Sequence, residues 1–392
     1  MNKNNHLNKS SENRKQKKWE KAMVALFVMG VIALLAVLIF YNRSVIMSPL
    51  EGIGRKSTSE AGFPVRLPGS TGYSINKFDS GFMLLTETYV YVYDSDGGQR
   101  YNKRHSYSEP NAAVADTRIL VYDINGKQYS FYGRNGLIYE KETDERILYG
   151  AIGEDSSAAI VYKHEVYANT LEIYDGKGDW RYKTKFLDDN IIQIAFTAAD
   201  KDIIITSMSF KDGDVIAAVH KYDTELEDDS GLWKTELPGN AMPFALHIGR
   251  NNAFVVCDKS LLTIDLNDGK ILDSYDYKGN LIDYAFSDNS VALLVNDFTA
   301  GTVTLISLNG NNKSETVVSS GATQVEFVSG SIYVLEPNTI AVYPTTQLSL
   351  PHNRLSLGEE YSRFIQVNND ILLLGYNNVE KLDINNTTEN TT

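Results

Sequence analysis

Cysteine, tryptophan and proline are scarce in this sequence. One cysteine, three tryptophans and nine prolines occur among its 392 residues. A single cysteine cannot form an intrachain disulfide, so the fold depends on its core rather than on covalent cross-links. This cysteine, Cys257, lies in the apolar run AFVVCD, and we expect it to be a buried, unreactive packing residue.

The usual motifs of catalytic and metal sites are also missing. There is no Gly-x-Ser-x-Gly nucleophile elbow, no His-Glu-x-x-His motif and no glycine-rich phosphate loop ahead of a helix. The segment YDSDGG at 93–98 lacks the third aspartate and the distant glutamate of a calcium loop, which favours a tight turn. None of the six histidines has metal-ligand spacing: His6, His105, His164, His220, His247 and His352. We predict no catalytic, cofactor-binding or metal site, and no cofactor.

Positive charge is scarce beyond residue 41. Residues 42–392 contain 30 basic and 48 acidic residues, a net charge of −18, without a basic stripe. This balance argues against nucleic acid and anionic lipid as partners, because both carry negative charge. Residues 1–41 have seven basic and two acidic residues, a net charge of +5. The asymmetry predicts different environments for the two parts of the chain.

The one long hydrophobic run is AMVALFVMGVIALLAVLIFY at 22–41, which contains no charge and no proline. Twenty helical residues span about 30 Å, the thickness of the hydrocarbon core of a bilayer. A cleaved signal peptide has a shorter apolar region of about 7–15 residues, and Tyr41-Asn42-Arg43 is a poor cleavage context. We predict a signal-anchor helix with a cytoplasmic N-terminus, because the basic residues cluster before it.

The chain therefore divides into five predicted parts. They are a basic cytoplasmic stub (1–21), a transmembrane helix (22–41), a juxtamembrane linker (42–61), a β-domain (62–385) and a disordered polar tail (386–392). The β-domain is expected to lie outside the cytoplasm, tethered to the cell membrane through residues 22–41.

Short apolar runs recur about every 40 residues in the β-domain. They are FMLLT (82–86), ILVYD (119–123), SAAIVY (157–162), DIIITS (202–207), AFVVCD (253–258), VALLV (291–295), SIYVLE (331–336) and ILLLGY (371–376). This period accommodates four strands and their turns, the unit of a propeller blade. We predict an all-β, eight-bladed β-propeller in which these runs are second strands, buried on both faces. Seven blades are the alternative, because the unit with the acidic insert TELEDDSG at 224–231 is irregular.

An Asp-x-Asn-Gly-like phrase recurs with the same period. We expect each copy to be the tight turn between the third and outermost strands of a blade, where Gly or Asn supplies a positive φ. The copies lie at 93–97, 122–126, 174–178, 261–277, 306–310 and 382–386. The last unit, at about residues 361–385, lacks an outermost strand. We predict that the lone strand in GFPVRLPG at 62–69 supplies it and closes the ring, since an open ring exposes edge strands.

Several phrases resemble known propeller repeats. The segment LLTIDLNDGKILDSYDY resembles the quinoprotein-type repeat, and IAFTAADKDIIITS and YAFSDNSVALLV are similar to WD40-like phrases. Asp273 stands where quinoprotein repeats place a tryptophan, so no quinone cofactor is expected. A basic stub, one membrane helix, a Phe-Pro strand and an acidic propeller together resemble an uncharacterised family of membrane-anchored propellers of Clostridia-type Gram-positive bacteria. That resemblance implies a fold and a cell-surface setting, but no activity.

Loops between second and third strands supply the candidate partner contacts: His164, Tyr167, Phe210 and Phe298. We predict a non-enzymatic, membrane-tethered binding module or scaffold for an envelope protein or a cell-wall polymer. The alternative is a cell-wall glycan hydrolase or lyase that uses channel carboxylates. The side chains considered for that role follow the innermost strands: Asp116, Glu154, Asp155, Asp200, Asn251, Asp288 and Asn369. They are equally suited to satisfying the backbone of hairpin turns.

Overall fold

The computed structural model describes residues 62–67, 73–226, 231–239, 241–310, 312–345 and 348–382. Residues 1–56 form one unit of the chain and residues 57–392 form a second, to which all described residues belong. The predicted stub, membrane helix, linker and polar tail lie outside the described residues. Within the described ranges, no helix combines the length and the apolar character needed to cross a membrane.

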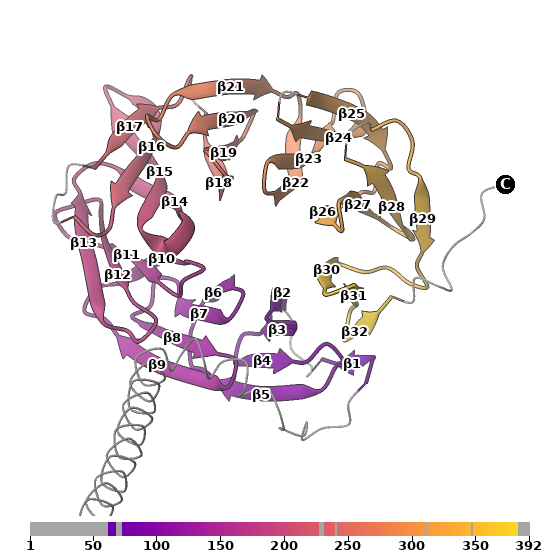
Figure 1. Cartoon of the computed structure of the whole chain (residues 1–392), viewed down its shortest axis with the longest axis horizontal. Coiled ribbons are helices and arrows are strands. Elements are labelled where there is room, and N and C mark those ends of the chain that lie inside the picture. Colours follow the sequence, from indigo (N-terminus) through magenta and orange to yellow (C-terminus); the bar gives the residue numbers. More distant parts are fainter. Residues whose placement is uncertain are drawn as a thin grey trace, which may run out of the picture. The chain divides into compact units, whose positions relative to one another are not determined.

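Eight four-stranded antiparallel sheets follow one another around a central opening, which confirms the eight-bladed prediction (Figure 1). The innermost strands are β2 (Ser74–Phe78), β6 (Pro110–Ala115), β10 (Ile147–Ile152), β14 (Asn190–Phe196), β18 (Pro243–Ile248), β22 (Asn280–Ser287), β26 (Gln324–Val328) and β30 (Arg363–Val367). The second strands are β3 (Gly81–Leu85), β7 (Arg118–Asp123), β11 (Ala158–Lys163), β15 (Asp202–Lys211), β19 (Asn252–Cys257), β23 (Ser290–Asp297), β27 (Ser331–Glu336) and β31 (Asp370–Leu374).

The outer half of each blade is a second pair of strands. The third strands are β4 (Tyr89–Tyr93), β8 (Gln128–Gly133), β12 (Asn169–Tyr174), β16 (Asp214–Asp223), β20 (Ser260–Asp265), β24 (Thr302–Asn309), β28 (Thr339–Pro344) and β32 (Asn378–Lys381). The outermost strands of blades 1–7 are β5 (Gln99–Arg104), β9 (Gly136–Glu142), β13 (Trp180–Phe186), β17 (Trp233–Glu236), β21 (Ile271–Asp276), β25 (Asn312–Val318) and β29 (Asn353–Ser356).

Blade 8 is completed by the start of the described chain. Its outermost strand is β1 (Val65–Arg66), which pairs antiparallel with β32. Val65 lies opposite Val379, and the N–H of Leu67 donates to the carbonyl of Asn377 at 2.8 Å. The predicted closure of the ring by the 62–69 segment is therefore confirmed.

Side chains of the second and third strands fill the space between neighbouring blades. All eight apolar runs predicted from the sequence fall on second strands, and every residue of β3 is buried. Between blades 3 and 4, for example, Val161 and Leu171 cluster with Ile203 and Ile205. Because each blade has a neighbour on both sides, its middle strands need apolar residues on both faces.

The turn phrase at 122–126 does not lie where the sequence predicted. It joins β7 to β8, the second and third strands of blade 2. There Asp123 Oδ1 accepts hydrogen bonds from the N–H groups of Ser108 and Glu109, at 2.9 and 2.8 Å. An Asn-Gly turn suits any tight hairpin, so its sequence does not specify which two strands it joins. The copies at 93–97, 174–178, 261–277 and 306–310 do join third to outermost strands, and the copy at 382–386 extends beyond the described residues.

Cys257 is fully buried in β19, as predicted. Its side chain packs with Ile204 and Val219 of blade 4. Burial raises the pKa of the Cys257 thiol to about 12, so the reactive thiolate is scarce at neutral pH.

Replacing Val65 with aspartate tests the ring closure. Val65 is 7% exposed and packs with Leu84 and Val379 between blades 1 and 8, so a carboxylate there loses apolar contacts and part of its hydration. We expect V65D to lower the free energy of unfolding by about 2–4 kcal/mol in urea titrations. The control R66D changes an exposed residue of the same strand and should cost less than about 1 kcal/mol. Equal losses in both variants would contradict the proposed role of β1.

Candidate functional site

Three exposed apolar side chains lie in connections of blades 3 and 4. Val166 is 74% exposed in the β11–β12 connection, Leu187 is 63% exposed in the β13–β14 connection, and Phe210 is 71% exposed near the tip of the β15–β16 hairpin. We call these three residues the blade 3–4 patch. At such exposure, most of the apolar surface of these side chains is in contact with water. Exposed apolar side chains that lie together are typical of binding surfaces.

Hydrogen bonds connect the segments that carry the patch. The N–H of Ala168 donates to the carbonyl of Leu187 at 3.0 Å, which joins the β11–β12 and β13–β14 connections. Asn190 and Met208 are partners in the ladder between β14 and β15, and Asn190 Nδ2 lies 3.4 Å from the carbonyl of Met208. The end of the β13–β14 connection is therefore next to the strand that carries Phe210.

A buried polar network lies beneath this connection. Asp189, two residues after Leu187, forms an ion pair with Lys234 at 2.8 Å and accepts a hydrogen bond from Ser207 at 3.3 Å. His220 Nε2 is 2.7 Å from Ser207 Oγ, and burial lowers the pKa of His220 to about 4, so its imidazole is neutral at pH 7. The network fixes the loop that carries Leu187.

This network is not a hydrolase triad, although it contains a serine, a histidine and an aspartate. Both Ser207 and Asp189 approach the same His220 nitrogen, Nε2, at 2.7 and 4.0 Å. In a triad the aspartate holds the opposite ring nitrogen. Ser207 is also fully buried, so its hydroxyl cannot reach a substrate.

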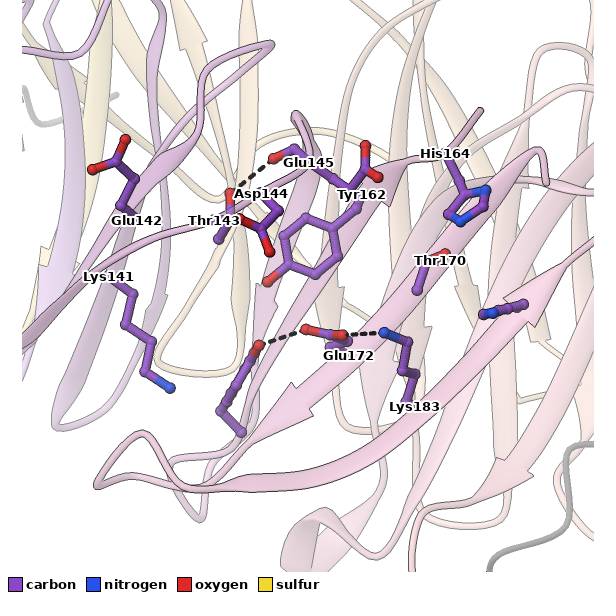
Figure 2. Close-up of a pocket in the computed structure, with 12 residues that line it drawn as sticks. Lys141, Glu142, Thr143, Asp144, Glu145, Tyr162, His164, Thr170, Glu172 and Lys183 are labelled. Atoms are coloured by element: carbon purple, nitrogen blue, oxygen red, sulfur yellow. Dashed lines mark hydrogen bonds and ion pairs between the residues drawn. The ribbon is translucent and has the colours of Figure 1, made fainter. Parts of the chain in front are cut away.

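A pocket of about 380 Å³ adjoins the 164–168 loop, between the outer strands of blades 2 and 3 (Figure 2). Lys141 of β9 enters it from blade 2, while Tyr162, Glu172 and Lys183 come from three successive strands of blade 3. His164 lies at its edge, as the close-up shows.

Two of the charged side chains in this pocket, Glu172 and Lys183, form an ion pair with each other. Lys183 Nζ is 2.7 Å from Glu172 Oε1, and Tyr174 donates to the other oxygen of Glu172. Lys141 Nζ lies 4.0 Å from the centre of the Tyr174 ring, and desolvation lowers the pKa of Lys141. The pocket is thus a polar recess with an aromatic wall, suited to receiving a side chain of a bound partner.

The predicted contact residues do not all belong to one surface. His164 Nδ1 accepts the N–H groups of Val166 and Tyr167, at 3.1 and 3.2 Å, so the first two predicted residues stabilise the loop that presents Val166. Phe210 belongs to the patch itself. Phe298, 72% exposed, lies in the β23–β24 connection of blade 6, away from blades 3 and 4 along the ring. Sequence reasoning missed Val166 and Leu187, because an isolated apolar residue in a loop carries no periodic signal.

The carboxylates considered for glycan chemistry lie in hairpin turns. Asp155 and Asp200 come close enough for Asp155 to raise the pKa of Asp200, although burial of Asp200 is the larger cause. Asp200 is fully buried, and its Oδ2 accepts the N–H of Ser157 at 2.8 Å, across the interface of blades 3 and 4. A buried, backbone-bound carboxylate cannot contact a polymer, so Asp200 serves the fold.

Two other acids, which sequence reasoning missed, lie on the innermost strands. Burial raises the pKa of Glu326 on β26 to about 7, and neighbouring Asp283 on β22 contributes in the same direction. Burial also raises the pKa of Asp283, whose Oδ2 accepts the N–H of Val325 at 2.9 Å. The positive charge of Arg363 on β30 lowers the pKa of both carboxyl groups and so opposes the effect of burial. Within the described residues, no group of three or more His, Cys, Asp or Glu is placed to hold a metal ion.

A single family model matches residues 65–384, from β1 to just beyond β32. The chain belongs to DUF5711, a family of unknown function. Curated proteins include no significant match. The expected membership of an uncharacterised propeller family is confirmed, whereas membrane anchoring and a Gram-positive origin stay predictions.

Solved propellers are similar in fold at low identity. BamB from Moraxella catarrhalis has a TM-score of 0.56 at 12% identity, over 82% of this chain and 96% of that one. Sqt1 from Saccharomyces cerevisiae has a TM-score of 0.58 at 10% identity, over 82% and 97% of the two chains. The dihydro-heme d1 dehydrogenase NirN has a TM-score of 0.54 at 15% identity, over 75% and 67%. Likeness at this level shows a WD40-like propeller fold alone.

The buried carboxyl of Glu326 predicts a pH-dependent stability. Its pKa rises from 4.5 to about 7 on folding, so its contribution to stability is complete below pH 4.5 and is lost as the pH rises through 7. We expect E326Q to be more stable than the natural protein at pH 8.5 by about 1–3 kcal/mol, with the difference vanishing near pH 4.5. Urea titrations between pH 4.5 and pH 8.5 measure this difference in the free energy of unfolding. E154Q, in an exposed turn, is the control, and a difference that is constant with pH would contradict the shift.

Proposed function

We propose that this chain is a membrane-tethered scaffold whose extracytoplasmic propeller binds an envelope protein through the blade 3–4 patch. The observation that carries the proposal is the placement of Val166, Leu187 and Phe210, each more than 60% exposed, on neighbouring segments of blades 3 and 4. Residues 22–41 would provide the tether, as their uninterrupted apolar sequence indicates.

An apolar patch favours a protein over a cell-wall polymer as the partner. Burying apolar surface contributes about 25 cal/mol per Å², and protein interfaces concentrate that gain in a few aromatic and aliphatic side chains. The neighbouring pocket adds lysines, carboxylates and a tyrosine wall that can fix the orientation of a polar side chain from the partner. A glycan would leave Phe210 and Leu187 without matching apolar surface.

The enzymatic alternative is a glycan hydrolase or lyase that uses Asp283 and Glu326. It requires two carboxylates that both reach the substrate. Asp283 is instead bound to the backbone N–H of Val325, which favours a structural role for this residue. Release of soluble glycan fragments by the natural protein, but not by E326Q, would support the enzyme instead of the scaffold.

The lone buried cysteine allows a direct test of the tether. Cys257 is fully buried, so the natural protein should give almost no background with a membrane-impermeant maleimide. We expect L350C, at a position 77% exposed, to be labelled in intact cells of the native host. N5C, in the basic stub, should be labelled only after the cells are permeabilised. Labelling of N5C in intact cells, or protection of L350C, would contradict the proposed orientation.

The patch itself is tested with a photo-crosslinking amino acid at position 210 in the full-length protein. We expect one discrete adduct from position 210 and none from position 350, which is equally exposed but lies in the β28–β29 connection. Adding L187D should reduce the yield of the adduct at least tenfold. The carboxylate would replace a leucine contact that is buried only in the complex and that contributes more than about 1.4 kcal/mol to binding. The control L350D should leave it unchanged. An adduct that survives L187D would show that the patch is not the interface.

A further inference from the structure

A cavity of about 370 Å³ opens between three neighbouring innermost strands, β26, β30 and β2, which border the central opening (Figure 1). These strands belong to blades 7, 8 and 1, so the cavity lies at the join that β1 completes. It shares no lining residue with the blade 3–4 patch or with the pocket of Figure 2.

Two cations in this cavity have no ion-pair partner among the described residues. Arg363 and Lys77 both line it and both have exposed side chains, yet neither lies within 4 Å of a carboxylate there. By contrast, Arg100 of blade 1 contacts two carboxylates, Asp79 and Asp94. A guanidinium and an ammonium that line one small concave site are a recognition element for an anion.

The acids beside these cations limit the charge of that anion. Glu326 lines the cavity, and Asp283 lies behind it, bound to the N–H of Val325. A dianion such as sulfate would be repelled by Asp283, and by Glu326 as well once Glu326 is ionised, whereas the single charge of a carboxylate is matched by Arg363 and Lys77. Once Glu326 is protonated, its carboxyl can donate a hydrogen bond to the bound anion.

The remaining lining is apolar and amide in character. Ile75, Phe327 and Ile365 supply apolar surface, and Asn76 supplies an amide. This combination suits a ligand with small aliphatic groups and peptide bonds next to its charge.

We propose that this cavity binds the terminal carboxylate of a short peptide. Arg363 pairs with the carboxylate in a bidentate manner, and Lys77 adds a second positive charge. Glu326, in its protonated form, donates to the same carboxylate, while Asn76 hydrogen-bonds the first peptide group. The apolar residues accommodate side chains of alanine size. The site is independent of the scaffold function of the patch.

Calorimetric titration of the detergent-solubilised full-length protein tests this proposal. The probe is N-acetyl-alanyl-alanine, and its C-terminal amide and inorganic sulfate are the two comparison ligands. We expect the acid to bind at least tenfold more tightly than either comparison ligand at pH 6. R363Q should weaken binding of the acid at least tenfold, and K77Q about threefold. Equal binding of acid and amide, or tighter binding of sulfate, would overturn the proposal.

Matched controls separate this effect from loss of structure. R104Q and K103Q remove the same charges from the exposed strand β5 and should leave binding unchanged. Thermal melts should show that R363Q and K77Q remain folded, because both side chains are exposed. If R104Q weakens binding as much as R363Q does, general electrostatic attraction explains the data and the cavity does not.

The role of Glu326 is tested by changing the pH. The charged and titratable groups around Glu326 are Asp283 on β22, Arg363 on β30 and Lys77 on β2, with Tyr333 opposite on β27. Only Glu326 is expected to change its charge between pH 6 and pH 8.5. Affinity for the acid should therefore fall about tenfold over this range in the natural protein and stay constant in E326Q. The same pH dependence in both proteins would refute the role of Glu326.

Discussion

The pairing of Val65 with Val379 is the contact on which the rest of the ring depends. Seven blades form from consecutive strands, and local sequence suffices to build each of them. The eighth requires two segments more than 300 residues apart to meet, at an entropic cost that rises slowly with loop length. That cost is offset by apolar packing of Val65 and Val379 with Leu84 of blade 1, so closure joins the last blade to the first.

Much of this architecture is visible in the sequence, because the constraints that produce it are local and repeated. Middle strands must be apolar on both faces, so runs such as AFVVCD and VALLV mark them directly. Strand order within a blade is less visible. The phrase at 122–126 has the chemistry of a third-to-outermost turn, yet it joins second to third strands, since turn residues encode a backbone conformation and not a position in a sheet.

The sites were less predictable, because they arise between blades. The loops that carry Val166 and Leu187 meet only because the chain leaves the outer edge of blade 3 and returns to the centre in blade 4. Glu326 and Arg363 lie 37 positions apart, and nothing in either local sequence shows that one is half-buried and the other open to solvent. His164 lies in a loop that the sequence predicts to contact a partner. In the structure its ring accepts the N–H of Val166, so it stabilises the backbone next to the patch and is not part of the patch itself.

The brevity of β1 has a mechanical consequence. Only two of its residues lie in the ladder with β32, whereas other neighbouring strands share up to ten pairs. Tension applied to the chain ahead of residue 65 would therefore act on the pairing of β1 with β32 before it acts on any complete blade. Because this pairing has few hydrogen bonds to break, it would separate at low force and leave seven four-stranded sheets intact. Blade 8 would then be the part of the ring that opens first under force, and stretching of the chain would be relieved there.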